Sequence, residues 1–456
     1  MAHHYHMMIL ERDYVALQSF LFQDCEIERA AFLRCRLSTT DTQIRFLVRG
    51  VHLLDGDDLN YATDQSMSIK STAFMPVLKQ ADKQGEAIIF VHSHPCGIAF
   101  FSRQDDATEP AFFRTAFHRI EDIHSHGSVV FSDPSTFIGR VWFANGKQIP
   151  LSTISIIGNR WRFLSSFKLS EPKQEYFDRQ IRAFGPDMQR TLQQLHIGVV
   201  GAGGTGSAVI EQLIRLGVGK LTVFDDQIFE LSNINRVYNS RVRDNGKSKV
   251  SIVQRTVADT QLGTNINLIQ ARITDEATAK RLRECDVIFG CTDDQYGRAI
   301  LNALSLRYYV PVIDMGIKIY SRDGQITHIN GRVTLLQPGN ICLHCRKRID
   351  ANQIRFESMH PEELERLRGQ GYAPELNDPA PAVITFTSSI ASNAVTEFLN
   401  RLIGFVDEET SPSELIYSFH SREILASSPK PREGCECQNQ LIWGSGDTNL
   451  FLGMTW

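Results

Sequence analysis

The chain of 456 residues has no apolar run that approaches the roughly 20 residues needed to cross a membrane. Neither sign of charge dominates, because 48 lysine and arginine residues face 52 aspartate and glutamate residues, for a net charge of −4. Such a balance gives no general attraction to nucleic acid or to an anionic membrane, and we expect neither as a partner. The first residues also lack the basic segment and apolar core of a secretory signal, so we expect a cytoplasmic protein.

Internal repeats and low-complexity tracts are absent as well, and the chain is too long for one hydrophobic core. We place a first domain at residues 1–160, a linker at 161–175, a second domain at 176–440 and a C-terminal tail at 441–456. The pattern of the first domain predicts mixed helix and strand. Its expected strands are 28–37, 42–54, 86–91, 126–132 and 139–144, and its expected helix is 72–85.

Cysteine is scarce, and four of the nine residues form two close pairs near the C-terminal end. In a long chain without a secretory signal, paired spacing favours zinc over a disulfide framework. Four thiolates close a tetrahedral site, which makes such a site structural. We expect one structural Zn²⁺ held by Cys342, Cys345, Cys435 and Cys437.

The second domain opens with residues 196–226, which read as strand, glycine turn, helix and strand. This order predicts a parallel βαβ unit, and 285–291 and 311–317 predict further buried strands of a doubly wound, Rossmann-like sheet. Residues 347–381 are polar and charged without strand character, and their length predicts a mobile functional loop. Residues 388–403 predict an amphipathic helix.

The segment VHSHPCGIAFFSRQDD, residues 91–106, carries candidate metal ligands. His92 and His94 are two residues apart at the end of an expected strand, so their side chains project to the same side. Asp105 can return from the following loop as a third ligand. Two imidazoles and a carboxylate leave a fourth position open, as in a catalytic zinc site that activates water. Ser102 is placed to stabilise the resulting oxyanion.

A strand that ends in His-x-His-Pro can also be an ordinary turn. The full string is His-x-His, seven residues, Ser, two residues and Asp, and it resembles the signature of the JAMM or JAB metalloproteases over about the first third of the chain. The resemblance implies an α+β domain that cleaves peptide or isopeptide bonds after ubiquitin-like C-termini. It also implies a glutamate general base, for which we choose Glu28 over Glu26 on the same face. Cys96, inside the motif, is not a ligand position.

The glycine turn GAGGTG lies between a strand and a helix, where backbone N–H groups cradle phosphate. Its glycines expected to contact the ligand are Gly201, Gly203, Gly204 and Gly206. Asp225 ends the next strand, where an acid commonly binds ribose hydroxyls. The turn alone fits NAD, FAD or ATP.

Cationic and acidic residues around this turn narrow the choice of ligand. They are Arg179, Asn233, Arg236, Lys249 and Asp293. Several cations around a triphosphate and one acid for Mg²⁺ are what adenylyl transfer requires, whereas hydride transfer has no such need. The set therefore favours ATP and Mg²⁺.

In order and spacing, residues 176–437 resemble the ThiF/MoeB type of ubiquitin-activating-like adenylyltransferase. The resemblance implies that Asp225 binds ribose and that Arg236 and Lys249 bind the phosphates. Asp293 would then hold Mg²⁺.

The same resemblance implies that Arg179 reaches into the nucleotide site of a partner protomer, and hence a homodimer. Gln227 departs from the pattern, because relatives often carry a second acid there. Residues 346–434 contain no cysteine, although relatives generally place a reactive cysteine in this segment. We therefore expect catalysis to stop at the acyl-adenylate.

Together these features predict an α/β enzyme with a JAB/JAMM-like domain and a Rossmann-like ThiF-type domain. The second domain would adenylate the C-terminus of a ubiquitin-like β-grasp protein with ATP and Mg²⁺, and the first would trim or deconjugate it with a catalytic Zn²⁺. A conjugating enzyme or a sulfur donor would be a further partner, since both pathways remain open. Two alternatives also remain: a first domain that binds without catalysis, and an NAD-dependent oxidoreductase.

Overall fold

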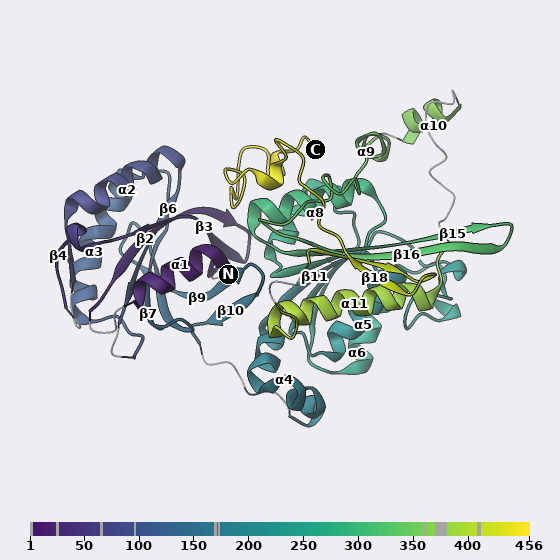
Figure 1. Ribbon diagram of the computed structural model, residues 1–456, viewed down its shortest axis with the longest axis horizontal. Coiled ribbons are helices and arrows are strands. Elements are labelled where there is room, and N and C mark those ends of the chain that lie inside the picture. Colours follow the sequence, from purple (N-terminus) through teal and green to yellow (C-terminus); the bar gives the residue numbers. More distant parts are fainter. Residues whose placement is uncertain are drawn as a thin grey trace. The chain divides into compact units, whose positions relative to one another are not determined.

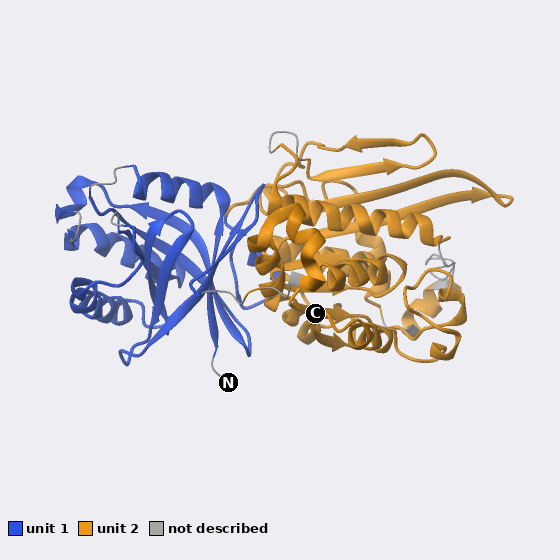
Figure 2. Ribbon diagram, turned by 90° about the horizontal axis from the view of Figure 1, so that it is seen from below, with its two compact units in different colours: residues 1–169, 307–309, 441–453 blue, residues 170–306, 310–440, 454–456 orange. Residues whose placement is uncertain are grey.

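The computed structural model describes residues 3–23, 27–63, 67–94, 97–167, 171, 174–359, 361–369, 381–407 and 412–456. The chain divides into two compact units (Figure 2). Unit 1 comprises residues 1–169, 307–309 and 441–453, and unit 2 comprises 170–306, 310–440 and 454–456. Glu26, Cys96 and part of the expected loop, residues 370–380, lie outside the described residues.

Unit 1 is built on one sheet of eight strands in the order β1-β3-β2-β6-β7-β8-β9-β10. The strands are β1 (His4–Leu10), β2 (Ala30–Thr39), β3 (Gln43–Leu53), β6 (Ala87–Ser93), β7 (His126–Asp133), β8 (Thr136–Trp142), β9 (Gln148–Ile157) and β10 (Arg162–Ser165). β1 also pairs with β9, so the sheet closes on itself. The expected pairing of β2 with β3 is confirmed as antiparallel.

The helices of unit 1 cover the two faces of this sheet (Figure 1). They are α1 (Glu11–Leu21), α2 (Ser71–Gln84) and α3 (Arg103–Arg119), with the short helix η1 (Gly56–Asp58) and a separate ribbon of β4 (Leu59–Ala62) and β5 (Met67–Ile69). Alternate residues of β2 face opposite sides: Leu33 packs in the α1 core, and Phe32 packs in the core of α2 and α3. α2, which the sequence predicted, ends at Gly85 in the left-handed conformation.

Unit 2 is built on a second sheet of eight strands in the order β13-β12-β11-β14-β15-β16-β17-β18. The strands are β11 (His196–Val200), β12 (Lys220–Phe224), β13 (Asn265–Ile269), β14 (Val287–Gly290), β15 (Val312–Arg322), β16 (Gln325–Leu336), β17 (Glu414–Ser418) and β18 (Glu423–Ala426). The five neighbouring strands β13, β12, β11, β14 and β15 are parallel to one another, and the pairs β15–β16, β16–β17 and β17–β18 are antiparallel. β11 lies between β12 and β14, so the strand order reverses there, as in a doubly wound sheet.

The helices of unit 2 include the βαβ helix expected from the sequence. They are α4 (Gln174–Gln194, kinked at Gly185), α5 (Gly204–Arg215), α6 (Lys249–Thr260), α7 (Glu276–Arg281), α8 (Gln295–Tyr308), α9 (Ala351–Glu357), α10 (Pro361–Gly369) and α11 (Ile384–Ile403), with short helices η2 (Leu231–Asn233), η3 (Val242–Asp244), η4 (Leu282–Glu284) and η6 (Glu436–Gln438). The short helix η7 (Phe451–Gly453) belongs to unit 1. The segment expected as a mobile loop without strand character thus contains α9 and α10. Asp350 begins α9, because its carboxylate accepts from the N–H groups of Asn352 and Gln353.

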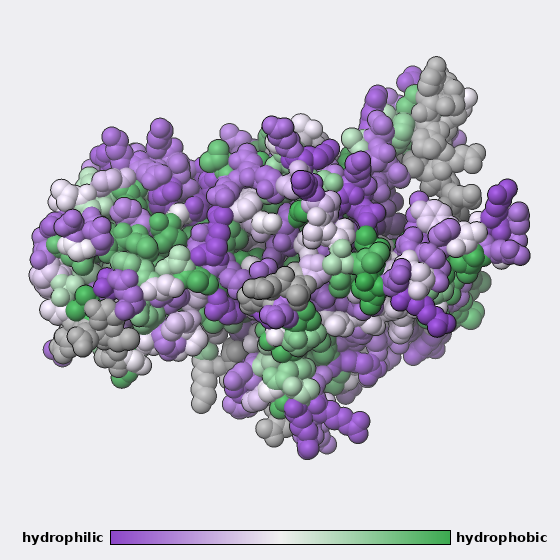
Figure 3. Space-filling model, in the orientation of Figure 1, coloured by the Kyte–Doolittle hydropathy of each residue, from purple (hydrophilic) through white to green (hydrophobic). Residues whose placement is uncertain are grey.

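No helix in the described part of the chain is long and apolar enough to cross a membrane. In the face shown in Figure 3, hydrophilic residues predominate and apolar residues lie among them in small groups.

Candidate active sites

The candidate zinc site of unit 1 begins with the pairing of β2 and β6. These strands are antiparallel, with Ala30 opposite His92. Continuing this register past the end of β2 brings Glu28 opposite His94. Glu28 Oε1 lies 3.6 Å from His94 Nε2, and both residues are buried. The strand register thus sets the expected base beside an expected ligand.

The third ligand comes from the first turn of α3. Ser102 Oγ accepts from Asp105 N–H at 3.2 Å, and Ser102 N–H donates to Asp105 Oδ2 at 2.7 Å. This capping box fixes the carboxylate, and its Oδ1 lies 3.3 Å from His92 Nε2. Burial works to raise the pKa of Asp105, but hydrogen bonds with His92 and Ser102 hold that pKa below its usual range. The carboxylate is therefore ionised at neutral pH.

The three donors have the spacing of a zinc site. His92 Nε2 lies 3.2 Å from His94 Nε2, and the Asp105 carboxylate oxygens lie 3.3 and 3.8 Å from these two atoms. Zinc–ligand distances of about 2.0–2.1 Å give a tetrahedron with edges of about 3.3–3.4 Å. Burial and the neighbouring His92 lower the pKa of His94 to about 4, so its imidazole is neutral and can coordinate a metal. The donor set fits Zn²⁺ with one position left for substrate or water.

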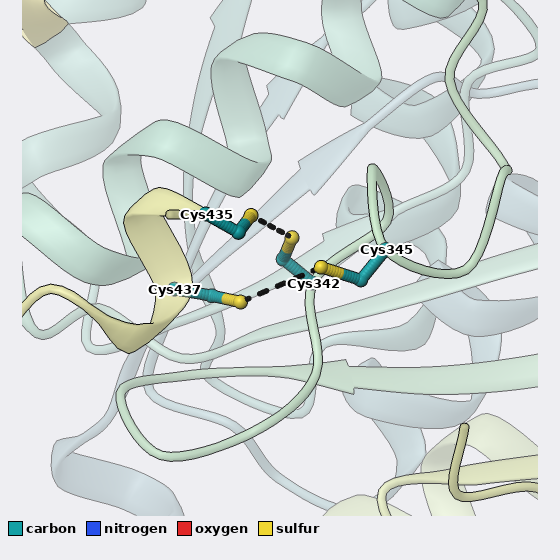
Figure 4. A group of neighbouring side chains, drawn as sticks. All are labelled: Cys342, Cys345, Cys435 and Cys437. Carbon is teal, nitrogen blue, oxygen red and sulfur yellow. Dashed lines mark hydrogen bonds between the residues drawn. The ribbon is translucent and has the colours of Figure 1, made fainter. Parts of the chain in front are cut away.

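Four cysteines converge in unit 2 (Figure 4). Cys342 Sγ lies 3.5 Å from Cys435 Sγ, and Cys345 Sγ lies 3.8 Å from Cys437 Sγ. All four sulfur atoms lie within 4.8 Å of one another, and none is in a disulfide. With Zn–S distances of about 2.3 Å, a tetrahedron has edges of about 3.8 Å. The four thiols therefore fit a closed Zn²⁺ site.

A cavity of about 610 Å³ lies in unit 2 at the carboxyl ends of β11, β12 and β14. The expected nucleotide-binding residues that line it are Gly201, Gly203, Gly204, Asp225, Arg236, Lys249 and Asp293. In open α/β sheets, ligands bind in the crevice where the strand order reverses. This cavity occupies that crevice.

The glycine turn needs glycine because the backbone packs closely there and because a ligand must approach the N-terminus of α5. Gly201 has φ +95°, and a Cβ there would lie 2.8 Å from the carbonyl oxygen of Cys291. A Cβ at Gly206 would lie 1.8 Å from the carbonyl oxygen of Gly201, so Gly206 serves the packing of α5 against the turn. Gly203 and Gly204 begin α5, where the helix dipole favours an anion.

Asp225 ties the end of β12 to the glycine turn. Its Oδ2 accepts from Ala202 N–H at 2.7 Å, and its Oδ1 accepts from Gln227 N–H at 2.9 Å. Burial raises the pKa of Asp225, and the Ala202 hydrogen bond and the Lys249 charge oppose that shift. Each carboxylate oxygen has further lone-pair capacity for a ribose hydroxyl.

Arg236 and Lys249 are held by neutral partners. Arg236 Nη1 donates to the carbonyl oxygen of Ser232 at 2.7 Å, and Lys249 Nζ donates to Gln227 Oε1 at 2.5 Å. Gln227 is the position at which the resemblance to the ThiF/MoeB type led us to expect an acid. A neutral amide orients the Lys249 ammonium group without neutralising its charge, so the charge stays available to phosphate.

Two arginines of the cavity were missed by the sequence reasoning. Arg298 Nη1 donates to the carbonyl oxygen of Asp293 at 3.3 Å, and its Nε lies 3.4 Å from the buried Asp314. Arg272 follows β13 and pairs with Asp226 at 2.7 Å. Ligand sites gather at the carboxyl ends of parallel strands, so the sequence could have predicted Arg272 as a residue of the site. Arg298 lies on α8 and has no such signal.

Three expected residues do not line the cavity, and Gly206, which serves the packing of α5, is one of them. Arg179 is exposed on α4. Asn233 is buried, and its Oδ1 accepts from Glu230 N–H at 3.5 Å, which caps η2. The structure thus gives Asn233 a local role in the turn that carries Arg236.

Several curated proteins are similar to this chain. The molybdopterin-synthase adenylyltransferase of Escherichia coli is 31% identical over 184 residues, which cover 40% of this chain and 71% of the relative. The SAMP-activating enzyme E1 of Haloferax volcanii is 28% identical over 35% of this chain and 56% of its own length. Ubiquitin-like modifier-activating enzyme 5 of Dictyostelium discoideum is 28% identical over 52% of this chain and 67% of its own length.

Among solved structures, E. coli MccB with ATP is similar over 57% of this chain and 74% of its own, with 15% identity and a TM-score of 0.45. The family model for prokaryotic homologs of the JAB domain matches residues 16–119. The ThiF family model matches residues 177–439, which is more than half of the chain. Both resemblances predicted from the motifs are confirmed: the chain belongs to the ThiF family and carries a JAB-like domain ahead of its ThiF domain.

Proposed function

We propose that unit 2 adenylates the C-terminal carboxylate of a ubiquitin-like or sulfur-carrier protein. One observation carries this proposal: a single cavity collects the glycine turn, Asp225, Arg236, Lys249 and Asp293. The similarity to adenylyltransferases and activating enzymes supports it. Membership of the ThiF family argues against the NAD-dependent oxidoreductase, an interpretation that the glycine turn alone left open.

In this reaction the carboxylate oxygen attacks the α-phosphorus of ATP. The bond from that phosphorus to the oxygen bridging the β-phosphate breaks, and pyrophosphate leaves. The N-terminus of α5, Arg236 and Lys249 would hold the phosphate charge, and Asp225 would bind the ribose hydroxyls. Mg²⁺ at Asp293 would supply further positive charge to the phosphates.

We also propose a homodimer in which Arg179 contacts the nucleotide of the partner protomer. Arg179 is exposed and does not line the cavity of its own unit. An arginine placed in this way can add charge to the transition state only from a second protomer.

For unit 1 we propose hydrolysis of a peptide or isopeptide bond after the C-terminus of the modifier. His92, His94 and Asp105 would hold Zn²⁺, which when bound acidifies water and polarises the scissile carbonyl. Glu28 would accept the proton of the attacking water and pass it to the leaving amine. Ser102 would donate a hydrogen bond to the developing oxyanion. The complete donor set with a carboxylate beside it supports catalysis over a domain that only binds.

Exchange of labelled pyrophosphate into ATP tests the adenylation. Purified protein with its modifier should catalyse this exchange, and Asp293→Ala should reduce the rate by at least about 10²-fold, because metal-assisted charge stabilisation is lost. Asp259→Ala removes an exposed acid of α6 and is the matched control. Unchanged exchange in Asp293→Ala would remove Asp293 from the site.

We further propose that the acyl-adenylate passes directly to a partner's nucleophile. Cys35 and Cys285 are buried. Cys291 lines the nucleotide cavity, but burial raises the pKa of its thiol well above the usual range, so little thiolate forms. Incubation with ATP and modifier should give no covalent adduct on this chain that dithiothreitol removes, as judged by denaturing electrophoresis. A reducible adduct would contradict the proposal.

A further inference from the structure

A cavity of about 250 Å³ in unit 1 opens beside the candidate zinc site. One end is lined by Glu28, His92, Ser102 and Asp105. The remaining wall is largely apolar and comes from β2, the β4–β5 ribbon, β6, α2 and α3. Its apolar side chains include Phe32, Phe74, Phe90, Phe112, Met67 and Ile69.

The phenylalanines form a continuous path of rings that starts at a zinc ligand. The Phe90 ring stacks on the His92 ring, with centroids 5.2 Å apart and planes at 26°. Phe32 contacts both Phe90 and Phe112, at 5.4 and 5.2 Å. Phe74 meets the edge of Phe112 at 5.4 Å. The apolar wall therefore reaches the reacting end of the site.

An imperfectly filled core is the simplest alternative account of this cavity. Protein interiors are close-packed, and an apolar cavity of about 150 Å³ already holds a benzene ring. Phe74, Phe90 and Phe112 also remain partly exposed, although their rings pack against one another. A space larger than one ring, walled by partly exposed aromatic side chains and bordered by the hydrolytic residues, is better explained as a binding site.

We propose that this cavity receives the large apolar side chain, aromatic in the best case, of a substrate residue adjacent to the scissile bond. The inference rests on the proposed hydrolase function and adds the class of substrate that the hydrolase selects. Because Glu28, His92, Ser102 and Asp105 line the cavity, a residue next to the scissile bond is the one best placed to enter it. The wall also carries the buried carboxylates of Glu28 and Glu109, which disfavour an acidic side chain.

Glu109 is fixed in that wall by groups behind it. Its Oε2 accepts from Ser128 Oγ at 2.7 Å and from Arg140 Nε and Trp142 Nε1 at 2.9 Å each. The acidic part of the wall is therefore a rigid feature of the cavity.

Cleavage of internally quenched peptides by the zinc-loaded full chain tests the selection. The peptides place phenylalanine, leucine, glycine or glutamate on either side of the scissile bond. At one of the two positions, phenylalanine should raise kcat/KM over glycine by about 10- to 100-fold, as expected from burying an aromatic side chain. Glutamate should be the poorest. Equal rates for glycine and phenylalanine at both positions would overturn the inference and leave the hydrolase function intact.

A variant that fills the cavity can be compared with a matched variant that leaves it open. Thr108 and Thr115 are both exposed on α3, and each hydroxyl donates to the carbonyl four residues before it, but only Thr108 lines the cavity. Thr108→Trp should abolish the preference for phenylalanine while glycine peptides are still cleaved. Thr115→Trp should keep the preference, and a retained preference in Thr108→Trp would contradict the proposal.

Toluene mimics the phenylalanine side chain, so its binding tests the cavity independently of peptide hydrolysis. Saturation-transfer NMR should detect toluene binding to the wild type and to Thr115→Trp, and weaker or no binding to Thr108→Trp. Toluene binding without cleavage of any peptide would refute the hydrolase function and, with it, the assignment of the ligand as a substrate side chain. Absence of the difference in toluene binding would refute the cavity as a site.

Discussion

The two candidate metal sites of the molecule differ in how their donors are held. In unit 1, His92 lies on a strand, Glu28 and His94 extend the strand pairing, and Asp105 is fixed by a helix cap. In unit 2, four thiols come from the segment after β16 and from the start of η6, far apart in sequence. Backbone pairing and a helix cap position the first set. We expect a metal ion to fix the second set.

This difference is the one expected between a catalytic metal site and a structural one. Three donors and a neighbouring base leave one face open, and a scaffold of strand and helix keeps that geometry without metal. Four thiols would fill every tetrahedral position around Zn²⁺, as in a structural site whose metal binding is coupled to folding. Removing a donor should therefore affect folding in unit 2 and activity in unit 1.

The largest effect is expected at the cysteine site. Cys342→Ser should release one zinc equivalent and lower the free energy of unfolding of unit 2 by several kcal/mol, because metal binding at a structural site is coupled to folding. Zinc content by mass spectrometry and urea unfolding would measure both. Cys291→Ser, which alters a cysteine outside the cluster, should retain both zinc equivalents. Unchanged zinc content in Cys342→Ser would show that the four thiols do not form a metal site.

A large effect on activity alone is expected at Glu28. Glu28→Gln removes the proton acceptor and leaves the three ligands, so cleavage of a modifier precursor should fall by about 10²–10⁴-fold while zinc content is kept. Adenylation of an already trimmed modifier should continue at the wild-type rate. Trimming at the wild-type rate in this variant would mean that another residue, such as Glu26, is the base or that unit 1 is not a hydrolase.

The smallest effect is expected at the helix cap. Ser102→Ala removes the Oγ that accepts from Asp105 N–H, which should cost about 1 kcal/mol of stability. Cleavage should fall as well, because the hydroxyl proposed to stabilise the oxyanion is lost. Ser102→Thr keeps a hydroxyl and should restore the stability measured by urea unfolding. Equal stability of the alanine variant would show that the cap does not support this ligand.

The sequence predicted the chemical groups better than their surroundings. The string from His92 to Asp105 identified three donors because the spacing is local, and the Ser-x-x-Asp part of it also encodes the helix cap. The register that sets Glu28 opposite His94 depends on the pairing of β2 with β6, which are separated by β3 to β5 in the chain. Only a resemblance to a family could place that glutamate from the sequence.

Features that depend on the full packing could not be predicted. The cavity beside His92 requires the β4–β5 ribbon, α2 and α3 to enclose one space, and no motif records that arrangement. Arg298 reaches the nucleotide cavity from α8 through a contact with the carbonyl of Asp293. The helix α9 was missed because polar composition suggested a loop, although Asp350 supplies a helix cap.

Unit 1 is assembled from residues near both ends of the chain. Within it, Arg49 donates to the carbonyl oxygens of Leu441 at 2.6 Å and Trp443 at 3.2 Å, and Thr39 N–H donates to Asp447 at 2.8 Å. A ribosome makes the sheet of unit 1 first and residues 441–453 only after nearly all of unit 2. Until residues 441–453 are made, Arg49 and Thr39 lack these acceptors. We therefore expect a chain truncated before Leu441 to have a less stable unit 1, because these hydrogen bonds are lost.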